Sequence, residues 1–236
     1  MSMYKEINKN ESKNLGHVVY EELKREILSL ELVPGQGISE NEICKKFEVS
    51  RTPVRDALWR LQEQGFVATL PYRGTYVTKL NLSEIKQLIY MRISVETDVI
   101  YDFMEMATPM ILEEVRHLIR LQEAIIQEKN FTPDQFYHLD AQMHAVWFKI
   151  TGKPKIWEII QEAQVHYTRY RKLDFETETN FMRIIKDHNN LFEKIKDKDK
   201  AGLASSLQEH LAYSITRMKN HIEINYKDYF EDSLEA

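Results

Sequence analysis

The stretch from Ser50 to Leu61, SRTPVRDALWRL, constrains the fold more than any other part of the chain. Its apolar residues have the spacing of one helix face: Val54, Ala57, Leu58 and Leu61. Ser50 is a favoured N-cap, and proline is tolerated in a first helical turn. The opposite face is polar and carries Arg51, Thr52 and Arg55. Such a helix is either an ordinary amphipathic helix with a solvated basic face or a recognition helix for the major groove of DNA.

The segments before this helix predict a helix-turn-helix. A helical apolar pattern begins near His17 and ends at the Pro34-Gly35 turn. Ser39 is placed to cap a second, short helix, and a tight connection at Glu48-Val49 leads from that helix to Ser50. Two short helices joined by so brief a turn form a helix-turn-helix.

A β-hairpin is predicted directly after the helix-turn-helix. The runs Phe66–Leu70 and Thr75–Lys79 read as strands, and a turn that contains Arg73 and Gly74 joins them. A hairpin in this place forms the wing of a winged helix-turn-helix. An arginine on a narrow turn can reach into the minor groove of DNA, where the electrostatic potential is most negative.

Charge and cysteine content limit the class of protein. The net charge is −5, yet four arginines gather around one expected surface of the N-terminal part: Arg51, Arg55, Arg60 and Arg73. Local clustering matters more than total charge for phosphate binding. The single cysteine excludes an intrachain disulfide framework, and no apolar run approaches the length of a membrane span. We therefore expect a cytoplasmic protein with no membrane partner.

From residue 81 onward every apolar pattern is helical, and no strand is predicted. Start and stop signals divide this part into six helices with the approximate limits 83–106, 109–129, 132–150, 154–173, 177–196 and 199–226. Six helices of this length favour an antiparallel bundle around one core. The expected fold is therefore mainly α, with a winged helix-turn-helix at residues 1–80 and an all-α antiparallel helical bundle at residues 81–236.

Four polar residues lie on or beside apolar stripes of the predicted bundle: Asp140, His144, His188 and His210. A single inward histidine is usually a satisfied core residue. Three histidines on three different helices, with an aspartate one turn before one of them, favour a metal site instead. This donor set suits Zn²⁺, Ni²⁺ or Mn²⁺, with zinc the first choice.

Arg92 also falls on an apolar stripe, so its guanidinium is expected to point inward. A buried arginine needs an anionic partner. One interpretation is an internal salt bridge, with Glu96 as the partner. The other is that Arg92 and the metal together bind a small organic acid, in a pocket that His166 and Tyr170 help to line.

These motifs resemble known families. Residues 17–79 resemble the winged helix-turn-helix of the GntR family of bacterial transcription regulators. The resemblance rests on the Ser-Arg-Thr-Pro-Val-Arg run from Ser50 and on Arg73-Gly74 with Val77 downstream. It implies that Ser50 and Thr52 hold phosphates, that Arg51 and Arg55 reach guanine edges, and that Arg73 and Gly74 form the wing tip. Asn41 stands where some relatives have a DNA-contacting arginine.

The C-terminal part resembles the FCD effector domain of the FadR-type subfamily. Many members of that subfamily have an Asp-x3-His pair followed by two single histidines, which matches Asp140, His144, His188 and His210. The resemblance implies a transcription regulator, expected to be a repressor, that binds double-stranded operator DNA as a homodimer. It also implies control by a small carboxylate effector.

The alternative function is a metal-dependent hydrolase that carries a DNA-binding head. An aspartate and three histidines could activate water, but the chain has no His-Glu-x-x-His motif or comparable catalytic signature. We therefore expect a regulator that is not an enzyme.

Overall fold

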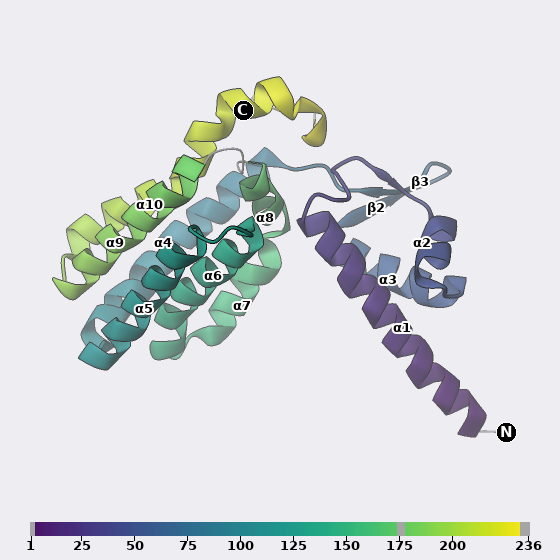
Figure 1. Cartoon of the computed structure of the whole chain (residues 1–236), viewed down its shortest axis with the longest axis horizontal. Coiled ribbons are helices and arrows are strands. Elements are labelled where there is room, and N and C mark those ends of the chain that lie inside the picture. The colour runs from purple at the N-terminus through teal and green to yellow at the C-terminus, as the bar shows by residue number, and fades with distance from the viewer. Residues whose placement is uncertain (1–2, 174–177, 232–236) are drawn as a thin grey trace. The chain divides into compact units, whose positions relative to one another are not determined.

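A computed structural model describes residues 3–173 and 178–231 of the chain. The chain forms two compact units (Figure 1). The first, which we call the head, contains the chain up to Leu82 together with the C-terminal segment from Tyr226. The second, the bundle, spans Ser83–Asn225. The limits expected from sequence, 1–80 and 81–236, differ from this division mainly at the C-terminus.

Three helices form the body of the head: α1 (Met3–Leu28), α2 (Glu40–Phe47) and α3 (Arg51–Glu63). The hydroxyl of Ser39 caps α2 by accepting from the Glu42 backbone N–H at 3.4 Å. The α3 residues Val54, Ala57 and Leu61 are fully buried, as their spacing predicts. The first helix begins at Met3, well before the expected start at His17.

The wing is part of a small antiparallel sheet in the order β1-β3-β2. Its strands are β1 (Gly37–Ile38), β2 (Val67–Leu70) and β3 (Gly74–Val77). In the β2–β3 hairpin Val67 pairs with Val77 and Leu70 with Gly74. The predicted hairpin is therefore present, and β1, which is too short to show a pattern in the sequence, adds a third strand.

Seven helices form the bundle within the described residues: α4 (Leu82–Met106), α5 (Pro109–Ile125), α6 (Pro133–Ile150), α7 (Pro154–Ala163), α8 (Val165–Lys172), α9 (Glu178–Lys196) and α10 (Lys200–Asn225). The expectation of six helices was wrong at one point, because the segment 154–173 is divided. The backbone leaves helical geometry at Gln164, with φ −94° and ψ 27°. Neither glycine nor proline marks this break in the sequence.

Aromatic side chains join the helices of the bundle. The rings of Phe103 on α4 and Trp147 on α6 lie 4.8 Å apart in an edge-to-face arrangement. About three turns earlier on α6, Phe136 packs edge-to-face against Phe181 of α9 at 4.7 Å. Because both contacts involve α6, this helix is the central element of the bundle core, and it also carries two of the expected metal ligands.

The chain after α10 returns to the head. A short 3₁₀ helix, η1 (Lys227–Tyr229), is followed by an isolated parallel bridge between Phe230 and Leu80. The Leu80 N–H donates to the Tyr229 carbonyl at 2.8 Å, and the Glu231 N–H donates to the Leu80 carbonyl at 3.1 Å. The side chains of Leu80 and Phe230 are both buried. The segment that follows the wing is therefore held by the C-terminal end of the chain.

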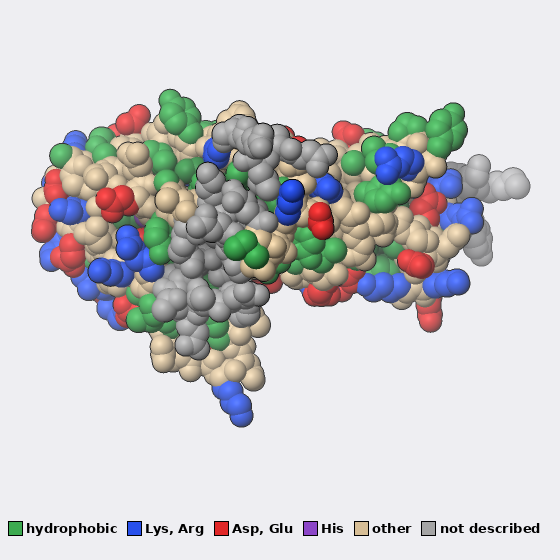
Figure 2. Space-filling view, turned by 90° about the horizontal axis from the view of Figure 1, so that it is seen from above, with side chains coloured by type: hydrophobic (Ala, Val, Ile, Leu, Met, Phe, Trp, Pro, Cys, Tyr) green, Lys and Arg blue, Asp and Glu red, His purple; other side chains and the backbone are tan. Residues whose placement is uncertain are grey.

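One face of the molecule is mixed in charge (Figure 2). Basic and acidic side chains are interspersed on this face. No helix among the described residues is long and apolar enough to cross a lipid bilayer.

Removing the Trp147 side chain tests the central position of α6. This residue is 2 % exposed and packs against Phe103. We expect Trp147→Ala to lower the free energy of unfolding by about 3–5 kcal/mol in urea denaturation, because it leaves a cavity. Met182 on α9 is 55 % exposed, so Met182→Ala should change stability by less than about 0.5 kcal/mol. Equal effects of the two substitutions would contradict this description of the core.

Candidate metal centre and DNA-binding surface

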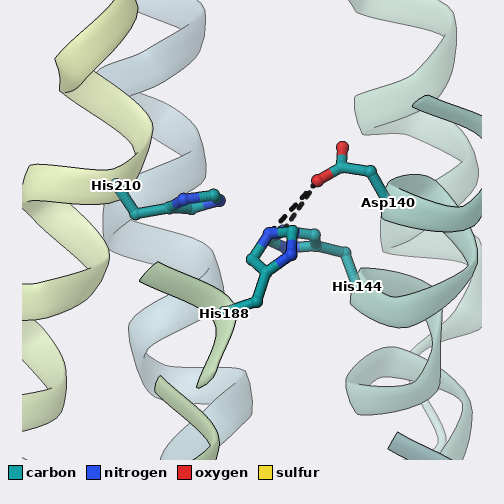
Figure 3. A group of neighbouring side chains, drawn as sticks. All are labelled: Asp140, His144, His188 and His210. Atoms are coloured by element: carbon teal, nitrogen blue, oxygen red, sulfur yellow. Dashed lines mark ion pairs between the residues drawn. The ribbon is translucent and has the colours of Figure 1, made fainter. Parts of the chain in front are cut away.

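The four expected metal ligands meet at the centre of the bundle (Figure 3). Asp140 and His144 come from successive turns of α6, His188 from α9 and His210 from α10. One ligand atom of each lies within 4.8 Å of those of the others. Asp140 Oδ1 is 3.3 Å from His188 Nε2 and 3.8 Å from His144 Nε2. The structure thus brings together residues that are up to 70 positions apart in the sequence.

Burial keeps this cluster in the form that binds metal. His144 and His188 are each 1 % exposed. Desolvation lowers the pKa of His188 and of His210, which favours neutral imidazoles at neutral pH. A neutral imidazole has a free nitrogen lone pair, which is the form that coordinates a metal.

A second set of residues orients the imidazoles. His144 Nδ1 lies 2.5 Å from Glu96 Oε2, and His188 Nδ1 lies 2.6 Å from Gln122 Oε1. Both oxygens are acceptors, so each Nδ1 carries the proton and each Nε2 is left with its lone pair. His210 Nδ1 faces Asp187 Oδ2 at the longer distance of 3.9 Å. Such outer partners fix the ring orientation and the tautomer of metal-binding histidines.

The unsatisfied atoms of the cluster fit a bound cation. Within the described residues, the Nε2 atoms of His144 and His188 are buried and have no hydrogen-bond partner. Leaving a buried polar atom unsatisfied costs about 1–3 kcal/mol, and coordination of a cation would remove this cost. Three imidazoles and one carboxylate are a donor set that Zn²⁺, Ni²⁺ and Mn²⁺ accept.

Asp140 is held ionised in this cluster. Burial by itself would raise its pKa, but the contact with His188 and the positive charge of Arg171 keep the pKa well below its usual range. Arg171 Nη1 donates to Asp140 Oδ2 at 2.9 Å, which leaves Oδ1 toward the imidazoles. The sequence did not indicate Arg171, because a basic pair such as Arg171-Lys172 is typical of a solvated helix face.

Arg92 makes the internal salt bridge. Its Nε donates to Glu96 Oε1 at 2.6 Å, and both residues are buried. Burial tends to raise the pKa of Glu96, but the charge of Arg92 and the hydrogen bonds from Arg92 and His144 lower it more, to about 2. Glu96 thus binds Arg92 with one carboxylate oxygen and His144 with the other.

A small cavity of about 30 Å³ adjoins the cluster. Its lining contains charged and aromatic residues and little aliphatic surface: Arg92, Tyr137, Asp140, His144, Tyr167, Arg171, Ile184, His210, Leu211 and Tyr213. Arg92 is therefore at the cavity as well as in its salt bridge.

The two other residues expected in the pocket, His166 and Tyr170, are not among the residues that line this cavity. Instead, Tyr167 and Arg171 face it from α8, each one position later in the chain. The break at Gln164 ends one helix and begins another, so the helical phase extrapolated from Pro154 fails here. His166 lies 3.3 Å from Glu84, and burial lowers its pKa to about 4.

The expected DNA-binding residues of α3 lie on its exposed side. Ser50, Arg51, Thr52 and Arg55 are all exposed. Ser50 occupies the N-cap position, but its side chain makes no capping hydrogen bond. Arg55 Nε donates to Glu40 Oε2 at 3.1 Å, and Arg51 Nη2 donates to Asn41 Oδ1 at 3.1 Å. The first turn of α2 thus positions both arginines, and Asn41 orients Arg51.

The wing tip carries the other two expected residues. Arg73 and Gly74 are exposed, and Gly74 has φ +103°, a conformation that favours glycine. The hydroxyl of Tyr76 donates to the Arg73 carbonyl at 2.8 Å, which ties the tip to the strand that follows.

Arg60 does not join this surface, contrary to the grouping made from sequence. Its guanidinium lies 3.9 Å from the centre of the Tyr20 ring, against α1. Arg60 follows Arg51 by nine residues, which is about half a rotation around the helix axis at about 100° per residue. The two side chains therefore leave α3 on opposite sides.

Comparisons with known proteins agree with this geometry. Residues 15–77 match the model of the bacterial regulatory proteins of the gntR family, and residues 87–213 match the FCD domain. The HTH-type transcriptional repressor RspR of Escherichia coli K12 is 25 % identical over 223 residues, which cover 94 % of this chain and 96 % of RspR. A transcriptional regulator of Streptomyces ambofaciens is 26 % identical over 194 residues, 82 % of this chain and 80 % of that protein.

The fold is also shared with solved structures. The E. coli protein McbR/YncC superposes with a TM-score of 0.68 over 88 % of this chain and 98 % of its own, at 20 % sequence identity.

Gln122 offers a test of the metal centre. Gln122 is fully buried on the face of α5 that also contains Val115 and Ile119. A polar residue on this otherwise apolar face was the feature of the sequence that could have identified Gln122 as a partner of the cluster. We expect purified protein to bind about one Zn²⁺ per chain, and Gln122→Ala to weaken zinc affinity by roughly 10- to 100-fold, because His188 loses its orienting acceptor. Competition with a chromophoric chelator measures the affinity. Gln142→Ala, on the exposed side of α6, is the control and should leave the affinity unchanged.

Proposed function

Since the chain belongs to the GntR family of bacterial regulatory proteins and carries an FCD domain, we propose that it represses transcription by binding operator DNA through the head. We further propose that a small carboxylate effector, held at a metal ion in the bundle, controls this binding. Both domains and the relatives are those of transcription regulators, not of enzymes, so the hydrolase alternative has no support. Repression is proposed because RspR is a repressor.

The observation that carries the DNA-binding proposal is the exposed face of α3. Arg51 and Arg55 are one helical turn apart, and their guanidinium groups are held by α2. In a major groove they would donate to guanine O6 and N7, while Ser50 and Thr52 would bond phosphates. Arg73 and Gly74 of the wing would enter the adjacent minor groove. Glu40 must release Arg55 when the guanidinium reaches a base.

The metal proposal rests on the paired Nδ1 atoms and the unsatisfied Nε2 atoms of the cluster. Asp140, His144, His188 and His210 would hold the ion, with zinc preferred over nickel or manganese. The ion would supply a Lewis-acidic position for a carboxylate oxygen of the effector. Arg92 would present its remaining guanidinium nitrogens to the same cavity. On this proposal the protein acts in the cytoplasm, where operator DNA lies.

A homodimer is proposed because one head can occupy only one half-site of a pseudopalindromic operator. The bundle offers an apolar surface for it. Ile156, Ile159 and Ala163 share one face of α7 by their spacing, and the two isoleucines are partly exposed. Ala163 also lines a shallow groove with Tyr90 and Met91 of α4. Tyr90 is 76 % exposed, which supports a second copy as the occupant of this surface.

Substitution of Arg55 tests the DNA-binding function. We expect Arg55→Ala to weaken binding to DNA from the region upstream of its own gene by about 1–3 kcal/mol, because a bidentate base contact is lost. An electrophoretic mobility shift at fixed salt concentration measures this loss. Arg25→Ala is the matched control and should leave DNA binding unchanged. Arg25 is also exposed, but it lies on α1 and pairs with Glu22 and Glu31. Undiminished binding by the Arg55→Ala protein would exclude α3 as the recognition helix.

Substitution of Ile159 tests the homodimer. We expect the wild-type chain to sediment as a dimer at micromolar concentration and Ile159→Glu to shift it to a monomer, because a buried charge would face an apolar partner surface. Met182→Glu places the same charge at an exposed position on α9 and should leave the dimer intact. A dimer that persists in the Ile159→Glu protein would place the interface elsewhere.

A further inference from the structure

The cavity beside the metal cluster contains a second arginine that the proposed carboxylate clamp does not use. Arg171 is half-buried and packs on two aromatic rings, with its guanidinium carbon 4.3 Å from the centre of the Tyr137 ring and 4.8 Å from that of Tyr167. Nη1 donates to Asp140 Oδ2. Nε is buried and has no hydrogen-bond partner among the described residues. Arg171 therefore has a free donor and lines the cavity.

The two arginines at the cavity, Arg92 and Arg171, differ in how fully a carboxylate neutralises their charge. Arg92 directs its Nε to Glu96, on the same helix and in a buried i,i+4 pair. Arg171 directs only Nη1 to Asp140, and Asp140 must also face the imidazoles. When Asp140 binds a cation through Oδ1, its negative charge is shared between the cation and Arg171. The guanidinium of Arg171 is then the less neutralised of the two.

The charges around the cavity can be counted. Glu96 balances Arg92, and Asp140 balances Arg171, so the protein groups sum to zero. Imidazoles that bind a metal are neutral. A divalent cation would therefore leave two positive charges uncompensated in a site where all four ligands are buried or nearly so. Uncompensated buried charge costs several kcal/mol, which favours an anion of matching charge.

We propose that the effector is a compact anion with two negative groups, such as a short dicarboxylate, of which one group binds the metal and the other binds Arg171 Nε. This inference rests on the proposed metal site and adds the charge of the ligand and a specificity-determining residue. The cavity of about 30 Å³ has room for about two water molecules, so only a short part of the ligand can be enclosed in it.

Calorimetric titration of the zinc-loaded full-length protein tests this inference, with malonate as the dianion and acetate as the monoanion. We expect malonate to bind roughly tenfold or more tightly than acetate at equal ionic strength. In Arg171→Met, compared at equal zinc occupancy, this preference should disappear. Arg116→Met is the control, because Arg116 pairs with Glu193 and does not line the cavity. Zinc content is measured after each titration to show that malonate has not removed the ion.

The outcomes separate this inference from the function on which it rests. Protein that takes up no zinc would overturn the metal site and the dianion together. Zinc-loaded protein that binds acetate as tightly as malonate, or that binds neither, would overturn only the dianion. A preference for malonate that persists in Arg171→Met would overturn the role of Arg171.

A second inference comes from the C-terminal segment that returns to the head, 226–231, which we call the C-terminal strap. Two chain segments join the units, one at Leu82–Ser83 and one at Asn225–Tyr226. The second continues directly from α10, the helix that carries His210. The strap ends against Leu80, which precedes the first junction. The helix with a metal ligand is thus connected to the segment that joins wing and bundle.

We infer that the C-terminal strap transmits the occupancy of the metal site to the Leu80–Leu82 segment. The α10 helix is continuous from His210 to Asn225, directly before the strap. Fixing His210 on a cation would therefore restrain the end of α10 and, with it, the start of the strap. The strap then restrains Leu80 through the two backbone hydrogen bonds with Tyr229 and Glu231. Burial of the Phe230 side chain anchors it in the head. This inference also depends on the proposed metal site.

Amide hydrogen exchange tests the strap directly, because the Leu80 and Glu231 N–H groups donate the hydrogen bonds that hold it. We expect zinc to slow the exchange of both amides several-fold in the wild-type chain and in Ile224→Ala, a control at a position 80 % exposed on α10. In Phe230→Ala the effect of zinc on the Leu80 amide should be lost although zinc still binds. Phe230→Leu, which keeps an apolar anchor, should restore it.

Two results would overturn the strap as a connection. One is exchange at Leu80 that is insensitive to zinc in a wild-type protein that binds zinc. The other is a full response to zinc in Phe230→Ala. A wild-type chain that binds no zinc would overturn the metal site and this inference with it.

Discussion

The pairing of buried polar groups between helices is the constraint on which the bundle depends. Asp140, His144 and His188 are buried at its centre, where leaving one without a partner would cost about 1–3 kcal/mol, and more for the charged Asp140. Their partners come from other helices: Glu96 from α4, Gln122 from α5 and Arg171 from α8. A shift of one helix along its neighbour would break at least one of these contacts. The geometry of the proposed metal centre is therefore set by the packing register of the helices.

The head differs from the bundle in that its functional groups are exposed. Apolar residues of α3 are buried, while Arg51 and Arg55 lie at the surface and are held by polar residues of α2. Contacts between exposed charged groups contribute little to stability, but they orient side chains before DNA arrives. The head thus presents its functional groups to DNA, whereas the bundle encloses its polar cluster, which we propose to be a metal site.

Much of this architecture was predictable from local patterns. The capped α2, the helix from Ser50, and the hairpin with Arg73 and Gly74 each depend on residues close in sequence, where spacing and turn chemistry determine the structure. The Asp140 and His144 pair was predictable for the same reason. The break at Gln164 was not, since no helix-breaking residue marks it, and this error placed His166 and Tyr170 at the pocket instead of Tyr167 and Arg171.

The sequence by itself determined which residue types lie on which helix face, and therefore the family, the two units and the four metal-binding candidates. Only the tertiary structure decided how those faces meet. It decided between the two interpretations of Arg92 in favour of the pair with Glu96, and it showed that Arg171 holds Asp140 and that Phe230 returns to Leu80. The physical reason is that periodicity records the direction of a side chain relative to its own helix. Partners distant in the chain are selected by packing and by the cost of leaving buried charges unpaired.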